Sequence, residues 1–145
     1  IVVLLTGPAR GYVKKELLKK KIKFIHIFAK SYNEVASFYN ALDLYIVSSR
    51  EEGGPMGLLE SIASGVPVVT TNVGMAMDVI EDGKNGAISD EITTKSISEK
   101  VEKIIQMSNI EKYELKKNAR KVISKFDWKI IAKEHFDKIY NPLMH

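Results

Sequence analysis

Two glutamates, eight positions apart, flank a glycine- and proline-rich loop near the middle of the chain. Glu52 precedes Gly53-Gly54-Pro55, and Glu60 follows Met56-Gly57-Leu58-Leu59. Glycines let backbone N–H groups approach a ligand that side chains would keep away. We predict that a helix begins at Met56, and the free N–H groups and partial positive charge of a helix start suit a phosphate. The segment therefore predicts an anion site between two carboxylates.

The two carboxylates could bind the groups attached to such an anion. Glu60 is placed to accept hydrogen bonds from a pair of vicinal hydroxyls, such as a ribose diol, and Glu52 to contact the group beyond the phosphates. Spacing alone also allows a plainer interpretation. In that interpretation Glu51 and Glu52 are solvated loop acids, and Glu60 complements the dipole of the helix.

Short apolar segments alternate with amphipathic ones along the chain. Strands are predicted at 1–5, 22–28, 44–47, 66–70 and 87–89, and helices at 12–20, 32–40, 56–64, 76–80, 96–107, 110–124 and 128–139. This alternation is typical of βαβ units and predicts an α/β fold, with a Rossmann-like parallel sheet covered by helices on both faces. No linker interrupts the pattern, so residues 1–145 are interpreted as one domain. Ligands of such sheets bind beyond the carboxyl ends of the strands, where the Glu52 loop lies.

Local signals refine three of these elements. Ser31 is the predicted N-cap of helix 32–40, with Glu34 completing a capping box. Gly65 is predicted to end helix 56–64 in the conformation that favours glycine. Trp128 and Phe136 lie eight positions apart on the last predicted helix, and this spacing assigns both to the core.

Several classes of site are not supported by the sequence. The chain has no Cys, which excludes a disulfide framework, a thiolate metal site and a cysteine nucleophile. His135 and His145 have no partner carboxylate at metal-binding spacing, so no metal site is predicted, and His26 is interpreted as a packed or hydrogen-bonded strand residue. Residues 7–11 match neither a P-loop nor a dinucleotide-binding motif, so no nicotinamide cofactor is expected. No apolar run approaches the ~20 residues that span a bilayer.

The net charge of +4 is concentrated in the last third of the chain. From Lys95 onward, 12 basic residues face 7 acidic ones, whereas the preceding part is nearly balanced. This tail is either a solvated helical face or a surface that attracts anionic headgroups or nucleic acid. The lysines around Phe24 have no accompanying stacking pattern, so we predict no nucleic-acid partner.

The segment 48–80 resembles the signature region of retaining, nucleotide-sugar-dependent glycosyltransferases of the GT-B fold, the large group-1, family-4-like set. Their motif reads S-x-x-E-G-G-P-x-x-x-L-E-x-x-A-x-G-x-P-V-V, with Glu-x7-Glu as its hallmark. The chain matches it at Ser49, Glu52-Gly53-Gly54-Pro55, Leu59-Glu60, Ala63, Gly65 and Pro67-Val68-Val69. Residues 72–80 and 82–86 resemble the following G-G-x-x-E-V-I-x-D-G-x-N-G. Shorter matches at 4–8, 41–44 and 126–128 extend the resemblance over nearly the whole chain.

The resemblance implies that the chain is most of the C-terminal, donor-binding domain of such an enzyme, truncated at its N-terminal side and without the acceptor-binding domain. The first glutamate of the family motif contacts the donor sugar and helps stabilise the reacting centre, which makes Glu52 the expected catalytic residue. The second glutamate binds the ribose, a role that falls to Glu60. The implied donor-binding residues are Gly53, Gly54, Pro55, Met56, Gly57, Leu58, Leu59 and Glu60.

The implied reaction transfers a sugar, with retention, from a nucleotide-diphosphate sugar to a glycan or lipid-linked acceptor in surface polysaccharide or glycolipid biosynthesis. It requires no metal and no cofactor. The acceptor would bind through the missing N-terminal domain. The resemblance places the enzyme in the cytoplasm, with peripheral contact at the inner face of the membrane. This chain alone is expected to bind donor weakly and to transfer nothing.

The chain also departs from the family pattern. The loop that supplies the phosphate-gripping Arg and Lys is absent, with Arg50 as the candidate substitute, and His26 stands where the second strand usually has Gly. Two alternative functions remain: a non-catalytic nucleotide-binding or interaction module of the same fold, and a relative of the nucleotide-sugar epimerases. The spacing E-G-G-P-x-x-x-L-E favours the transferase.

Overall fold

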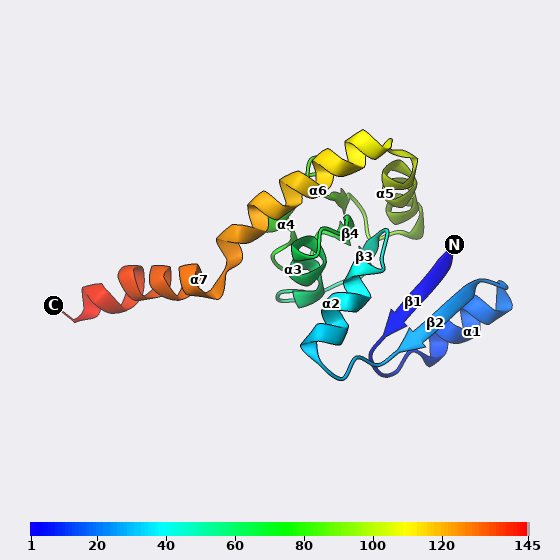
Figure 1. Cartoon of the computed structure of the whole chain (residues 1–145), viewed down its shortest axis with the longest axis horizontal. Coiled ribbons are helices and arrows are strands. Elements are labelled where there is room, and N and C mark those ends of the chain that lie inside the picture. The colour runs from blue at the N-terminus through cyan, green and yellow to red at the C-terminus, as the bar shows by residue number, and fades with distance from the viewer. Residues whose placement is uncertain (145) are drawn as a thin grey trace. The chain divides into compact units, whose positions relative to one another are not determined.

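The computed structural model describes residues 1–144, which form two compact units. The first unit is Ile1–Leu42, and the second begins at Asp43 and runs to the end of the described chain. Both units contain parallel strands connected through helices (Figure 1). The predicted α/β class is confirmed.

In the first unit two parallel strands pair with each other, and one helix connects them along the chain. Its elements are β1 (Val2–Thr6), α1 (Gly11–Lys19), β2 (Lys23–Ile27) and α2 (Tyr32–Asn40). The register runs from Val2 opposite Lys23 to Thr6 opposite Ile27. Nε2 of His26 lies 2.8 Å from the carbonyl oxygen of Gly7. A carbonyl oxygen only accepts, so Nε2 carries the proton, and His26 is the hydrogen-bonded histidine that the sequence predicts.

The start of α2 differs from the predicted capping box in one of its two bonds. The Ser31 hydroxyl accepts from the N–H of Glu34 at 3.3 Å, as an N-cap should. The Glu34 carboxylate, however, accepts from the N–H of Lys30 at 2.7 Å. In a capping box that second donor would be the N–H of Ser31 itself, so the reciprocal half of the prediction is wrong. The long Glu34 side chain reaches one residue further back along the chain.

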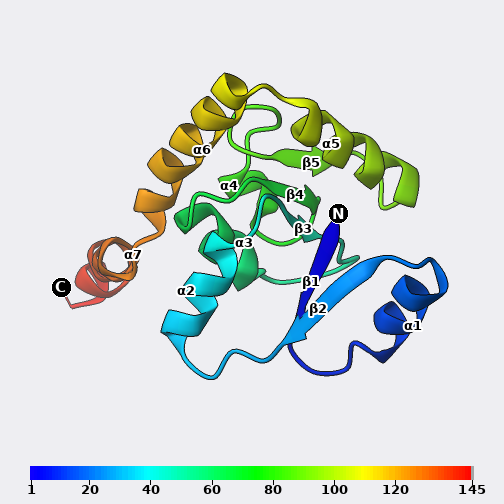
Figure 2. The ribbon, with the colours of Figure 1, turned by 45° about the vertical axis from the view of Figure 1, so that its right-hand side comes forward.

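The second unit is built on a three-stranded parallel sheet. Its elements are β3 (Tyr45–Val47), α3 (Met56–Ala63), β4 (Val68–Thr71), α4 (Ala76–Val79), β5 (Ala87–Ser89), α5 (Thr94–Gln106), α6 (Asn109–Ile123) and α7 (Trp128–His135). The sheet order is β3-β4-β5, with β4 in the centre (Figure 2). These bounds lie close to the predicted ranges.

Helices cover both faces of this sheet because successive strand residues point to opposite sides. Val68 packs into a cluster with Leu58 of α3 and Ala119 of α6. Its neighbour Val69 packs into a second cluster with Ile104 of α5. The unit is therefore layered with α3 and α6 on one face of the sheet and α5 on the other, as the sequence predicts.

The C-terminal segment corrects the sequence prediction. After α7 the backbone forms a π-helical turn at Phe136–Tyr140 and a 3₁₀ turn at Asn141–Leu143, whereas one continuous helix was predicted to residue 139. Trp128 is 73% exposed and Phe136 50% exposed, so their assignment to the core is wrong. The spacing of Trp128 and Phe136 indicates an apolar helix face, but it does not indicate which residues pack against that face. In Figure 1 this segment leads away from the three-stranded sheet.

Among residues 1–144, no helix is both long and apolar enough to cross a membrane. The longest α-helix within these residues, α6, has 15 residues and buries Leu115 and Ala119 among many charged positions. Helices of this kind are held by packing one apolar stripe against a sheet or another helix.

The turn at Gly65 allows a first test of the fold. Gly65 has φ +74°, and a Cβ there would lie 2.7 Å from a guanidinium nitrogen of Arg120 in α6. Gly65→Ala should lower the free energy of unfolding by about 1–2 kcal/mol, because left-handed backbone costs that much for a residue with a Cβ. Urea denaturation measures the change. Gly53→Ala, where a Cβ meets open space, is the control, and equal effects of the two variants would contradict the prediction.

Candidate functional site

The predicted anion site lies where β3 passes into α3. The helix begins at Met56, and its N-cap is Pro55, whose side chain makes no capping hydrogen bond. Proline has no side-chain acceptor, so no side chain caps the N–H groups of the first turn. One of them, the N–H of Leu58, bonds to the carbonyl oxygen of Pro55 at 2.9 Å. The start of α3 thus has the uncapped N–H groups and the positive dipole end that the sequence predicts.

Burial of the apolar side chains fixes the position of α3. Leu58 and Ile62 are completely buried beneath the sheet, and so is the small side chain of Ser61. Any part that Leu58 plays in ligand binding must therefore come from its backbone N–H, which a ligand would share with the carbonyl oxygen of Pro55. The same packing holds the first turn of α3 rigidly at the carboxyl end of β3.

Gly53 and Gly54 form the exposed part of the loop. A Cβ at Gly53 would meet nothing within 4 Å, so its backbone is open to approach from solvent. A Cβ at Gly54 would lie 3.3 Å from the terminal methyl of Met75, so Gly54 is supported from one side. The two glycines leave the backbone accessible in front of α3.

The two glutamates occupy different environments. Glu52 is exposed, and its carboxylate accepts a hydrogen bond from the Ser49 hydroxyl, three residues earlier. Glu60 lies at the start of the second turn of α3 and is partly buried. Both residues belong to the segment around the start of α3, and their roles toward a ligand stay predictions.

The sequence indicates residues 70–74 as one of the loops at the carboxyl ends of the strands, but it assigns no role to Thr71 or Gly74. Thr71 ends β4, and its hydroxyl donates to the carbonyl oxygen of Ser49 at 2.6 Å. Gly74 packs against the backbone of Glu52 and Gly53. The available signal was topological: β3 and β4 are neighbours, so the loops at their carboxyl ends had to lie side by side.

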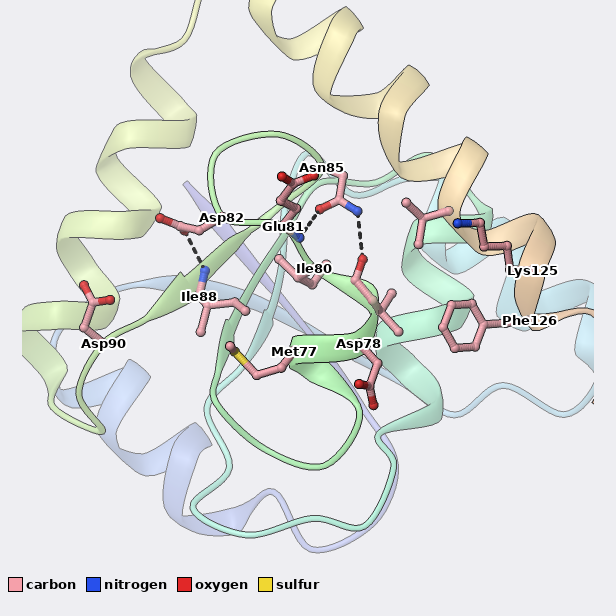
Figure 3. Close-up of a pocket in the computed structure, with 12 residues that line it drawn as sticks. Met77, Asp78, Ile80, Glu81, Asp82, Asn85, Ile88, Asp90, Lys125 and Phe126 are labelled. Atoms are coloured by element: carbon pink, nitrogen blue, oxygen red, sulfur yellow. Dashed lines mark hydrogen bonds between the residues drawn. The ribbon is translucent and has the colours of Figure 1, made fainter.

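A separate cavity of about 590 Å³ lies outside this segment (Figure 3). Its lining comes from α4 and the turn after it, from β5 and from the end of α6, and includes Ile80, Ile88 and Phe126. Asn85 fixes the turn: its carbonyl accepts from the N–H of Glu81 at 2.7 Å and its amide donates to the carbonyl of Val79 at 2.8 Å. None of the residues between Glu52 and Glu60 lines this cavity.

Asp82, which lines the same cavity, forms an ion pair with Lys100. Asp82 accepts from the N–H of Ile88 at 2.9 Å and from Nζ of Lys100 at 3.0 Å. Burial raises the pKa of Asp82, but these two hydrogen bonds and the nearby positive charges outweigh it, so the pKa lies below its ordinary value. The hydrogen bond to Asp82 in turn raises the pKa of Lys100.

Comparison with known proteins identifies the family. The family model described as glycosyl transferases group 1 matches residues 2–122. The chain belongs to this family. Among its relatives, the uncharacterized glycosyltransferase MJ1178 of Methanocaldococcus jannaschii is 32% identical over 86% of this chain and 36% of its own length. The capsular polysaccharide biosynthesis glycosyltransferase CapM of Staphylococcus aureus is 30% identical over 81% of this chain and 31% of its own length.

Solved structures share this fold, and one of them is the domain of a group 1 protein. The C-terminal domain of the group 1 family protein LpcC from Francisella tularensis is 28% identical, with a TM-score of 0.68, over 82% of this chain and 64% of that one. The Anabaena protein Alr3699/HepE, solved with UDP and glucose, is 20% identical, with a TM-score of 0.81, over 95% of this chain and 40% of that one. The group 1 chain described here has a GT-B, Rossmann-like fold and corresponds to the C-terminal part of its relatives. It spans about a third of the length of the curated relatives it matches.

The described residues include no group of three or more His, Asp or Glu side chains placed to hold a metal ion. The sequence-based expectation that the reaction needs no metal and no cofactor stays a prediction. The positive ends of backbone dipoles at the start of α3 are the elements of this site that suit a diphosphate.

The turn at Asn85 gives a second test of stability. Asn85→Ala should lower the free energy of unfolding by about 2–3 kcal/mol, because two hydrogen bonds are lost and the partly buried N–H of Glu81 and the buried carbonyl of Val79 lose their partner. Thermal and urea denaturation measure the loss. Asn72→Ala, at an exposed position, is the matched control. Equal stability of the two variants would show that the turn does not depend on the Asn85 side chain.

The ion pair gives a prediction of pH dependence. The pKa of Asp82 is lower in the folded chain than in the unfolded one, so its ionised form contributes stability above about pH 4, and this contribution is lost as the pH falls through the lowered folded pKa. The difference in free energy of unfolding between wild type and Asp82→Asn should stay constant at roughly pH 6–8 and shrink below about pH 4. Urea denaturation across this range measures it. A difference that persists unchanged at about pH 3 would refute the assignment.

Proposed function

We propose that this chain is the donor-binding half of a retaining glycosyltransferase. The enzyme would transfer a sugar from a nucleotide-diphosphate sugar to a glycan or lipid-linked acceptor in surface polysaccharide or glycolipid biosynthesis. The observation that carries the proposal is the uncapped start of α3, which lies behind the open glycine pair and between Glu52 and Glu60. Membership of the glycosyl transferases group 1 family supports it.

In this proposal the backbone holds the diphosphate. The N–H groups of Gly57, Leu58 and Leu59 lie in the first turn of α3, where the helix dipole favours negative charge. Departure of the nucleoside diphosphate develops negative charge on its phosphates as the glycosidic bond breaks. Fixed N–H dipoles that need no reorganisation would lower that barrier without a metal or a cofactor.

The two carboxylates would recognise the two ends of the donor. Glu60, on the second turn of α3, would accept hydrogen bonds from the ribose hydroxyls. Glu52, before the helix, would contact the sugar and stabilise the positive charge that develops at its anomeric carbon. The N–H groups of Gly53 and Gly54 would bind the sugar hydroxyls. Structural relatives include a protein solved with UDP and glucose, which supports a donor of this class.

The proposal extends to the whole protein. The relatives are about three times as long as this chain, which supports a partner domain that binds the acceptor. We propose that the enzyme acts in the cytoplasm, and that the basic tail from Lys95 onward contacts anionic lipid at the inner face of the membrane. Without the acceptor domain, this chain alone would transfer nothing.

Nucleotide titration of the isotope-labelled chain tests donor binding. UDP, GDP, ADP and their glucose conjugates are added while backbone amide shifts are followed. The expected result is a perturbation of amide shifts centred on residues 53–60. Glu60→Ala should weaken the nucleotide affinity derived from these shifts about tenfold or more, because the ribose loses a charged acceptor.

The matched control is Glu99→Ala, which removes an exposed helical glutamate in α5. It should leave the affinity unchanged. The absence of any shift in residues 53–60 at millimolar nucleotide would contradict donor binding by this chain.

A further inference from the structure

The end of β4 is connected to Glu52 by two successive hydrogen bonds. Thr71 is completely buried, and its hydroxyl donates to the carbonyl oxygen of Ser49 at 2.6 Å. The hydroxyl of Ser49 donates to the carboxylate of Glu52. A hydroxyl has one proton to donate, and a second carbonyl, that of Val47, lies farther away at 3.5 Å. Thr71 therefore donates its hydroxyl proton to the backbone of Ser49, and the side chain of Ser49 orients Glu52.

The backbone of Glu52 is supported by the same stretch of chain. Gly74 has φ +50°, and a Cβ there would lie 2.7 Å from the carbonyl oxygens of both Glu52 and Gly53. Only a glycine allows the two loops to approach so closely. The side chain of Glu52 is thus held through Thr71 and Ser49, while its backbone rests against Gly74.

We propose that Thr71 is a positioning residue for Glu52, acting through Ser49. An exposed glutamate on a glycine-rich loop otherwise samples many rotamers, and ordering it on ligand binding costs free energy. Holding the loop carbonyl and the carboxylate before the ligand arrives removes part of that cost. The inference rests on the proposed role of Glu52 at the donor sugar, and it adds a residue that touches neither sugar nor nucleotide.

The neighbouring threonine provides a matched control. Thr70 lies on the same strand and is equally buried, but its hydroxyl donates to the carbonyl of Thr71 at 2.8 Å and does not reach the loop. Thr70→Val and Thr71→Val make the same chemical change one position apart. A purely structural role of buried hydroxyls in β4 would affect both variants alike.

The first measurement needs no ligand. The backbone ¹⁵N order parameters of residues 50–54 in the 145-residue chain should be lower by about 0.1 or more in Thr71→Val than in Thr70→Val. Thr71→Ser retains the hydroxyl and should restore the wild-type order parameters. Ser49→Ala removes the second bond directly and replaces Thr71→Val as the test if that variant does not fold. Equal order parameters in the two valine variants would overturn the proposal.

The second measurement separates the sugar from the nucleotide. The probes are UDP and UDP-glucose, GDP and GDP-glucose, and ADP and ADP-glucose, and the pair that binds the wild-type chain is used for the variants. Thr71→Val should weaken the affinity for the glucose conjugate about three- to tenfold, because Glu52 faces the sugar. The affinity for the free nucleotide should stay unchanged. Thr70→Val should change neither.

The outcomes distinguish this inference from the proposed function. If Thr71→Val weakens the affinities for nucleotide and conjugate equally, or changes neither affinity, then Thr71 does not act through Glu52. In that case the inference fails, while donor binding stands. If the wild-type chain binds none of the probes, the proposed function fails. The comparison of order parameters then still decides whether Thr71 holds the Glu52 loop.

Discussion

The second unit of the chain depends on the burial of β4 on both of its faces. Val68 and Val69 are each inaccessible to solvent, although they point in opposite directions. Full burial of two such side chains contributes about 1.5–3 kcal/mol each relative to exposure, and it forces helices onto both sides of the sheet. Because β4 is the central strand, the positions of α3, α5 and α6 follow from it.

This constraint also determines where polar chemistry can lie. β4 is buried along its whole length, and ligands of parallel sheets bind beyond the carboxyl ends of the strands, here those of β3 and β4. There the chain presents an uncapped helix start and an open glycine pair, with an exposed carboxylate nearby. The completely buried Leu58 packs the helix against the core. This apolar packing holds the N–H groups of the first turn in place.

Much of this could be read from the sequence because the signals are local. Alternating apolar segments predicted the strands and helices. Gly65 predicted the end of α3, and its φ of +74° agrees with that role. The last helix was predicted less well. The spacing of Trp128 and Phe136 describes a helix with an apolar face, but exposure depends on what packs against that face, which is a property of distant residues.

The sequence by itself determined the order of elements and the residues around the start of α3, because helix starts, glycine turns and strand periodicity depend on neighbours in the chain. Only the tertiary structure decided what supports Glu52. Thr71 and Gly74 lie 19 and 22 positions further along the chain, and they reach the loop because β3 and β4 pair in parallel. A hydrogen bond across such a separation depends on strand order and register, which no local pattern specifies.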